Sequence, residues 1–208
     1  MITLWGRANS VNVQKVLWCC EELKIPFDRI DAGMQFGRND EAAYLAMNPT
    51  GRVPTLVDGD FVLWESNSIL RYLAMQYGPD STLCPADPKT RASADRWLDW
   101  TLSTLQPAER PLFWGYIRTS AAERNAAQLA VTASDVEKLW RVINTHLKGR
   151  DYLEGGTFTL ADIVIGAYAR RWFGIAELVR PALPDLERWY IGVTQRAGFQ
   201  RYVAPALS

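Results

Sequence analysis

Apolar positions in the first third of the chain are grouped in a way that predicts alternating strands and helices. Ile2 to Trp5 is a short apolar run closed by Gly6, which is typical of a buried strand. Between Val11 and Leu23 the apolar residues recur at helical spacing, and Ser10 is a suitable N-cap. Phe27 to Asp31 predicts a second strand. Because a helix joins the two strands, we expect them to pair in parallel.

The next segment predicts a hairpin and a further helix. Residues 32–40 contain glycine and asparagine and indicate a loop, and a short helix is expected from Glu41 to Met47. Two apolar runs, Val53 to Val57 and Phe61 to Trp64, flank an Asp-Gly turn, which is the pattern of a β-hairpin. Helical spacing returns from Glu65 to Tyr77. The first part of the chain is therefore predicted to be an α/β domain.

The pattern changes after Gly78 to Lys89, a segment with three prolines that we interpret as a linker. Strand signals disappear beyond it. Four helices are expected, at Thr90 to Tyr116, Ala121 to Leu147, Thr159 to Phe173 and Pro184 to Arg196. We therefore expect an α/β domain over residues 1–79 and an all-α domain over residues 88–208.

Composition narrows the classes of function. Hydrophobic residues make up 48% of the 208 positions, and Lys+Arg and Asp+Glu both number 23, so the formal net charge is zero. That balance gives no electrostatic reason to expect nucleic acid or an anionic membrane as partner. The three cysteines have no regular spacing, which favours a reducing compartment. The N-terminus lacks the apolar core of a signal peptide, and no run of 18 apolar residues occurs. We expect a soluble cytoplasmic protein.

The chain has a single histidine, His146, and this excludes sites that need several histidines. A histidine-rich zinc site cannot form, and the sequence contains no HExxH, no paired CxxC, no GxGxxG and no P-loop motif. His146 follows a long amphipathic stretch, so we interpret it as structural. No metal site is expected.

Pro54 is the first residue that suggests a binding edge. A proline cannot donate to a ladder, so it belongs at an edge, at a first position or after a cis bond. A cis bond there would expose the main-chain N–H and C=O of Val53, which could pair with an extended peptide. An ordinary edge proline is the equally simple alternative.

Glu65 and Ser66 start the helix that follows the hairpin. A helix N-terminus has free N–H groups and partial positive charge, which suit a carboxylate. Ser66 adds a hydroxyl donor, and Glu65 could accept from an α-ammonium group. Together they complement the head group of an amino acid, although a simple N-cap is the alternative.

Ser10 and Asn12 lie at the start of the first predicted helix. A hydroxyl at the helix mouth can donate to a thiolate, and hydrogen bonds to the charged form lower a thiol pKa. One unit of pKa corresponds to about 1.4 kcal/mol, within reach of one charge-assisted hydrogen bond. Taken alone, Ser10 would be interpreted as an N-cap only.

These features together carry a resemblance to a known family. The matching stretches are RANSVNVQKVLWCCEELKIPF, LAMNPTGRVPTLVDGDFVLWESNSILRYLA and FTLADIVIGA. Over nearly its whole length the chain resembles the cytosolic glutathione S-transferases, most of all the bacterial, serine-type, theta-like members. The resemblance implies a thioredoxin-like first domain and an all-helical second domain. It also implies glutathione as co-substrate, no tightly bound cofactor, and a homodimer with Trp64 and the Glu65 helix near the subunit contact.

The resemblance also assigns roles to residues. It implies that Val53 pairs with the cysteinyl backbone of glutathione, that Pro54 is cis, and that Glu65 and Ser66 bind the γ-glutamyl head. The glycyl carboxylate would lie near positively charged or amide side chains, the candidates being Arg52, Arg38 and Asn39.

The catalytic position is expected to be of the serine type. Trp5 lies where some classes of the family carry a tyrosine, and no tyrosine precedes Tyr44. Ser10 is therefore the expected thiolate stabiliser, with Asn12 as a substitute or helper. Cysteine-type classes need a thiol here, whereas Cys19 and Cys20 lie about two turns further along the helix and are expected in the core.

Two further expectations concern the helical half. Thr159 and Asp162 fit a capping box, so we interpret Asp162 as a folding residue. The second substrate, a small hydrophobic electrophile, is expected between the domains. The apolar candidates for its site are Ala8, Phe36, Leu105, Phe113, Trp114, Trp172 and Phe173.

The expected function is conjugation of an activated glutathione thiolate to such an electrophile. One alternative keeps the fold but changes the reaction to disulfide or peroxide reduction, dehalogenation or isomerisation. Another is a non-catalytic binding protein on the same scaffold.

Overall fold

The computed structural model describes all 208 residues and begins with a four-stranded sheet. Strands β1 (Ile2–Trp5) and β2 (Phe27–Ile30) pair in parallel, as predicted. The hairpin strands β3 (Thr55–Asp58) and β4 (Phe61–Trp64) are antiparallel to each other, and β3 is antiparallel to β1. The strand order is β2-β1-β3-β4, so β1 and β3 lie at the centre.

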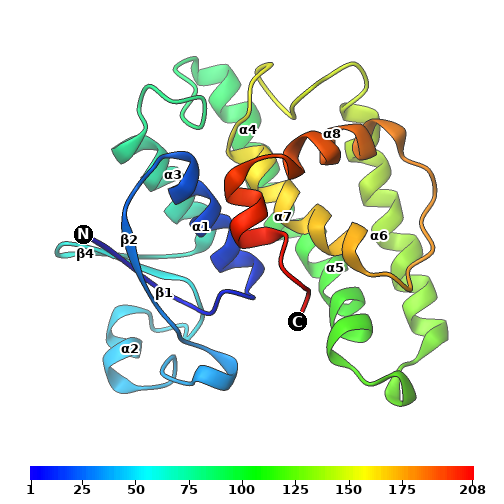
Figure 1. Cartoon of the computed structure of the whole chain (residues 1–208), viewed down its shortest axis with the longest axis horizontal. Coiled ribbons are helices and arrows are strands. Elements are labelled where there is room, and N and C mark those ends of the chain that lie inside the picture. Colours follow the sequence, from blue (N-terminus) through cyan, green and yellow to red (C-terminus); the bar gives the residue numbers. More distant parts are fainter.

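Three helices accompany the sheet. Helices α1 (Val11–Glu22) and α3 (Ser66–Tyr77) pack against each other, between the sheet and the second domain (Figure 1). The short α2 (Ala42–Met47) lies apart from that pair. Because α1 is sandwiched in this way, it is buried on more than one side, and even Lys15 has no exposed surface.

The second domain contains helices only, as expected, and occupies the green-to-red half of Figure 1. Its α-helices are α4 (Pro88–Trp100), α5 (Gln106–Phe113), α6 (Ala126–His146), α7 (Leu160–Gly174) and α8 (Pro184–Thr194). Two five-residue stretches of wider π-helical turns, at 101–105 and 114–118, make α4 and α5 one continuous helical rod. Pro107 and Pro111 lie in this rod and lack the N–H that an α-turn needs, which favours such irregular turns.

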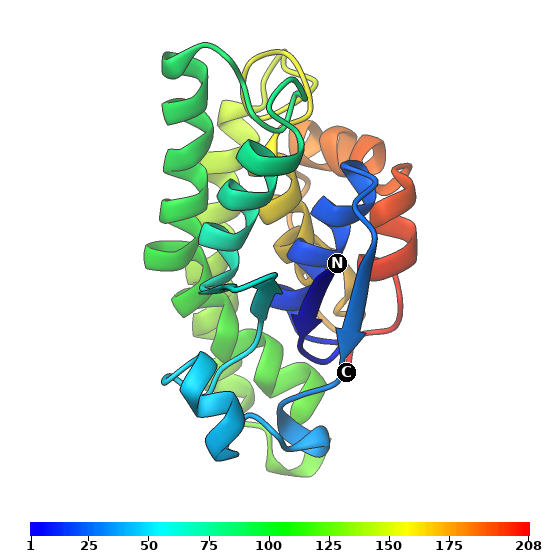
Figure 2. The same cartoon turned by 90° about the vertical axis from the view of Figure 1, so that its left-hand side faces the viewer.

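One hydrophobic core runs through both domains. Helix α7 is buried over almost its entire length and contacts α1, α3, α4 and α8 (Figures 1 and 2). Trp18 of α1 is fully buried and meets Phe158 and Phe199 of the second domain at ring distances of 5.7 and 5.4 Å. The Arg196 guanidinium seals the edge of this contact by pairing with Glu22. The two domains are thus joined by packed side chains rather than by the linker alone.

Several predicted boundaries shift for identifiable reasons. The third strand begins at Thr55 rather than Val53, because Pro54 has no N–H to give to the ladder. Helix α6 begins at Ala126, where Asn125 caps it by accepting from Gln128 N–H at 3.0 Å. The structure also contains short helical turns that the pattern did not predict, at Met34–Phe36 and Phe199–Val203.

Asp162 has the structural role that the sequence indicates. It lies in the first turn of α7, and its carboxylate accepts from the main-chain N–H groups of Thr159 and Leu153 and from Trp189 Nε1, at 2.9 to 3.0 Å. It is completely buried within the second domain. The pKa of this carboxyl is raised by burial, against the opposing effect of these donors. No helix in the chain is both long and apolar enough to cross a bilayer.

Candidate active site

Two adjoining cavities form one groove between the domains. The larger has a volume of about 300 Å³ and the smaller about 90 Å³. Four residues line both of them: Asn12, Arg52, Val53 and Gln106. The groove therefore lies where the start of α1, the segment before β3 and the start of α5 meet.

Ser10 lies at the floor of the larger cavity. It occupies the N-cap position of α1 with extended backbone angles, and its C=O accepts from Gln14 N–H. Its side chain, however, makes no capping hydrogen bond. The first main-chain N–H groups of α1 have no partner in the chain either. The hydroxyl and the positive end of the helix are therefore both free to act on an anion in this cavity.

Asn12 and Val53 form the junction between the two cavities. The Asn12 Oδ1 atom is buried and has no hydrogen-bond partner. The Val53–Pro54 peptide bond is cis, as the resemblance implied. Neither the N–H nor the C=O of Val53 forms a hydrogen bond within the chain. This segment therefore offers an unpaired donor and acceptor to an extended ligand.

Glu65 and Ser66 line the smaller cavity at the start of α3. Glu65 is the N-cap and has a positive φ of 70°, which is costly for a residue with a side chain. Its carboxylate makes no capping bond and is exposed. Ser66 is buried and follows it directly. The pair thus presents an acceptor and a hydroxyl donor side by side, as the sequence predicted.

The three candidates for the glycyl carboxylate are placed differently. Arg52 lines both cavities. Asn39 lines the larger one and is held by a hydrogen bond from its amide to the C=O of Gly51, at 2.7 Å. Arg38 is exposed and lines neither cavity. The structure brings two of the three to the groove.

The apolar candidates for the second site separate in the same way. Phe113 and Trp114 line the larger cavity. The remaining five do not reach it: Ala8 and Phe36 are exposed, Leu105 and Trp172 are buried in the core, and Phe173 stacks on Tyr190. Leu105 and Trp172 point inward because the helix faces that carry them pack on other helices. These five are not retained in the site.

The structure adds residues to the groove that the sequence analysis did not find. The additional side chains are Arg7, Met34, Gln106, Arg110, Arg118, Tyr168 and Arg171. Arg110, Trp114 and Arg118 are spaced four apart, so they share one face of the helical rod. The sequence spacing indicates that these three side chains share a helix face, but it does not tell that this face turns to the groove. The Tyr168 hydroxyl is buried without a partner, and burial raises its pKa.

The thiols and the histidine of the chain lie elsewhere. All three cysteines are free and buried, as expected for Cys19 and Cys20. Burial raises the pKa of Cys20 to about 12. His146 contacts the C=O of Leu153 through Nε2 at 2.8 Å, away from the groove. The chain has no group of three or more residues that could hold a metal ion. Thiol chemistry in this groove must therefore use a sulfur supplied by a ligand.

A mixed four-stranded sheet joined to a helical domain, with a free serine hydroxyl and an unpaired valine edge between them, defines a glutathione transferase. The family models agree: residues 1–75 match "Glutathione S-transferase, N-terminal domain" and residues 95–197 match "Glutathione S-transferase, C-terminal domain". The chain belongs to the glutathione S-transferase family.

Individual relatives span the whole chain. Glutathione S-transferase GstB of Escherichia coli is 41% identical over 205 residues, which is 98% of each chain. Glutathione S-transferase D6 of Drosophila melanogaster is 30% identical over 90% of this chain and 84% of its own. Among solved structures, a theta class enzyme of Xanthomonas axonopodis pv. citri with glutathione bound is 47% identical. It covers 100% of this chain and 99% of its own, with a TM-score of 0.95.

Proposed function

We propose that this protein is a glutathione transferase that holds the glutathione sulfur as a thiolate at Ser10 and transfers it to an electrophile. The observation that carries the proposal is the free Ser10 hydroxyl. A serine at an N-cap ordinarily accepts from its own helix, whereas this one makes no such bond and faces a cavity.

The rest of the groove supports an extended tripeptide. The exposed Glu65 carboxylate would accept from the α-ammonium of the γ-glutamyl head, and Ser66 with the N-terminus of α3 would donate to its carboxylate. Val53 would pair with the cysteinyl backbone. Arg52, with Asn39 beside it, would face the glycyl carboxylate. This order leads the cysteinyl sulfur towards the mouth of α1.

Once bound, the sulfur would lose its proton to solvent because two features favour the anion. The Ser10 hydroxyl donates to it, and the first turn of α1 supplies free N–H groups and partial positive charge. The thiolate then attacks the electrophilic carbon with its electron pair while a leaving group departs or a double bond accepts the pair. Proximity in the groove lowers the entropic part of the barrier.

The bound form of a relative supports the same arrangement. The Xanthomonas structure with glutathione has a TM-score of 0.95 against this chain, and the apo form of the same enzyme has 0.86. The structure of this chain as a whole is thus more similar to that of the form with glutathione bound.

The test is an ultraviolet titration of glutathione bound to the parent, to Ser10→Ala and to Asn12→Ala. Thiolate absorbance in the parent should appear well below the pKa of about 8.5 of a free thiol. The Ser10→Ala change should raise the pKa by about 1 to 2 units, the amount that one charge-assisted hydrogen bond provides. An unshifted pKa in the parent would refute the proposal.

The reaction type is separated by an assay panel on the same protein. Conjugation of electrophiles with little disulfide or peroxide reduction supports the transferase, whereas the reverse ratio supports a reductase. Glutathione binding without turnover would indicate a binding protein.

We also propose a cytoplasmic role in detoxification and a homodimer. The exposed Phe61, Trp64 and Met75 on β4 and α3 support the homodimer.

A further inference from the structure

The larger cavity of the groove is strongly basic. Five arginines line the larger cavity, and none of its lining residues is an aspartate or glutamate. The five are Arg7, Arg52, Arg110, Arg118 and Arg171. Such a lining differs from the hydrophobic site that the sequence analysis expected. The inference drawn below from this lining rests on the proposed function in one respect, that the same groove holds glutathione.

Three of these guanidinium groups gather around two aromatic rings. The Arg171 guanidinium lies 3.8 Å from the centroid of the Phe113 ring, and that of Arg118 lies 5.4 Å from it. Arg118 is also 5.0 Å from Trp114, which Arg110 approaches to 5.7 Å. The rings attract the cations but cannot cancel their charge. Phe113 is only 2% exposed whereas Trp114 is 42% exposed, so the ring among these cations that is open to a ligand is that of Trp114.

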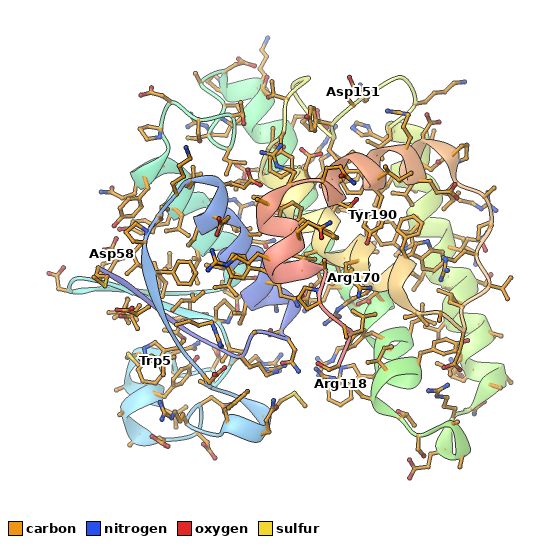
Figure 3. All side chains as sticks on the ribbon, in the orientation of Figure 1. Trp5, Asp58, Arg118, Asp151, Arg170 and Tyr190 are labelled. Carbon is orange, nitrogen blue, oxygen red and sulfur yellow. The ribbon has the colours of Figure 1, made fainter.

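Little within the chain neutralises this cluster. Arg171 is paired with the buried Glu109, at 3.0 Å. Neither Arg7 nor Arg118 forms an ion pair with a side chain; Arg118 donates to Met34 Sδ and to a main-chain oxygen of Ser208. Arg118 lies beside the C-terminal segment (Figure 3). The Arg7 Nε atom is buried without any partner.

The cations also act on one another. The pKa of Arg7 is lowered by burial and by the charges of Arg118 and Arg171. Burial and Arg171 lower the pKa of Arg118 in the same direction. Like charges held together in a partly buried site are destabilising unless an anion joins them. A negatively charged occupant would therefore stabilise the cluster.

We propose that the second substrate is an aromatic electrophile that carries a negative charge. Its ring would stack on Trp114, which is 42% exposed, and its carboxylate or comparable anion would lie between Arg7 and Arg118. Arg52 remains with the tripeptide, on the side of the groove formed by the first domain. The reacting carbon would then be directed towards Ser10, which lines the same cavity.

The test compares two substrates of similar size and shape, the anionic 4-(chloromethyl)benzoate and the neutral 4-(chloromethyl)benzamide. In both, the thiolate sulfur forms a bond to the benzylic carbon, the carbon–chlorine bond breaks, and chloride leaves with the electron pair. The ratio of kcat/KM to the uncatalysed rate constant corrects for intrinsic reactivity. We expect this ratio to be about tenfold or more in favour of the benzoate, as one charge-assisted contact would give.

Variants of individual arginines test which of them recognise the negative charge of the substrate. Arg118→Met and Arg7→Met should each remove most of the benzoate preference, so that the rate-corrected ratio of kcat/KM for the two substrates falls towards one. Arg141→Met is the matched control, since this arginine lies on α6 outside both cavities. Unreactive 4-methylbenzoate should compete with the electrophile, and 4-methylbenzamide should compete much less.

The outcomes separate this inference from the proposed function. A parent that accelerates the benzamide as much as the benzoate would overturn it. So would an Arg118→Met variant that raises the thiol pKa or weakens glutathione equally with both substrates, because the cluster would then serve the tripeptide. No conjugate from either substrate, with an acidic bound thiol, would overturn it as well and leave thiolate activation intact.

Discussion

Lys15 is a charged side chain enclosed in the middle of the molecule. It lies on α1 with no exposed surface, and Nζ donates to Asn67 Oδ1 at 2.8 Å. The Tyr168 ring lies 5.8 Å from the ammonium group. Burial lowers the pKa of Lys15 to about 7, although the charge of Glu65 opposes the shift. This lysine therefore titrates near neutral pH directly behind the groove.

The lowered pKa makes a prediction about stability. The unfolded chain, with an ordinary lysine pKa of about 10.4, binds a proton between pH 7 and 10 that the folded chain does not. The free energy of unfolding thus rises with pH in that window. Relative to Lys15→Met, the parent should gain about 2 kcal/mol or more between pH 7 and 9.5. Urea unfolding at the two pH values measures this.

The control for Lys15 is Lys89→Met, which removes an exposed ammonium group. Its unfolding free energy should run parallel to that of the parent across the same pH window, since other titrating groups are shared. Parallel curves for Lys15→Met as well would mean that the buried lysine stays protonated, and would contradict the prediction.

The groove residues that the sequence could indicate are those that lie close to one another along the chain. Ser10, Val53, Pro54, Glu65 and Ser66 each belong to a short motif whose residues stay close together after folding. The structure brings them to one groove. The arginines of the cavity come from four separate segments, and only the packing of the domains makes them neighbours, so no short motif could reveal the whole cluster.

At the scale of elements, the start of α7 is a sensitive position. Asp162 alone satisfies donors from the preceding loop, from Thr159 and from Trp189 of α8. The change Asp162→Ala should cost about 3 kcal/mol or more, because several buried donors lose their partner at once. Thr159→Ala should cost only about 1 kcal/mol, the usual value for a cap. Thermal or urea unfolding checks both.

Measurements of activity distinguish the structural role of Asp162 from a catalytic role. At a temperature where Asp162→Ala is folded, its kcat/KM should stay within a few-fold of the parent, since the carboxylate is remote from both cavities. A loss of several hundredfold in a variant of unchanged stability would instead assign Asp162 to catalysis.

The order and kind of the main elements could be read from the sequence, but not the details of the helical rod. Apolar spacing predicted a single helix from Thr90 to Tyr116. The rod runs from Pro88 to Arg118 and contains two π-helical stretches, at 101–105 and 114–118. Pro107 and Pro111 hint at irregularity, yet whether a proline kinks, widens or ends a helix depends on what packs around it.

At the scale of the whole molecule, β4 and α3 present an apolar face. We expect Met75→Lys to weaken the proposed homodimer strongly, because it places a charge on a residue that is 59% exposed in the single chain. Val131→Lys, at 58% exposure on α6, is the matched control and should stay dimeric. Sedimentation equilibrium at micromolar concentration measures both. A monomeric parent would refute the dimer.

The shared core constrains how the two domains can move. Trp18, Phe158 and Phe199 interlock across the boundary, and Arg196 stacks on Phe158 at 3.7 Å while pairing with Glu22. A hinge motion at this boundary would have to expose the buried indole ring of Trp18 to water. Opening the groove by separating the domains would remove Trp18 from the core, so we expect ligands to exchange while this boundary stays packed.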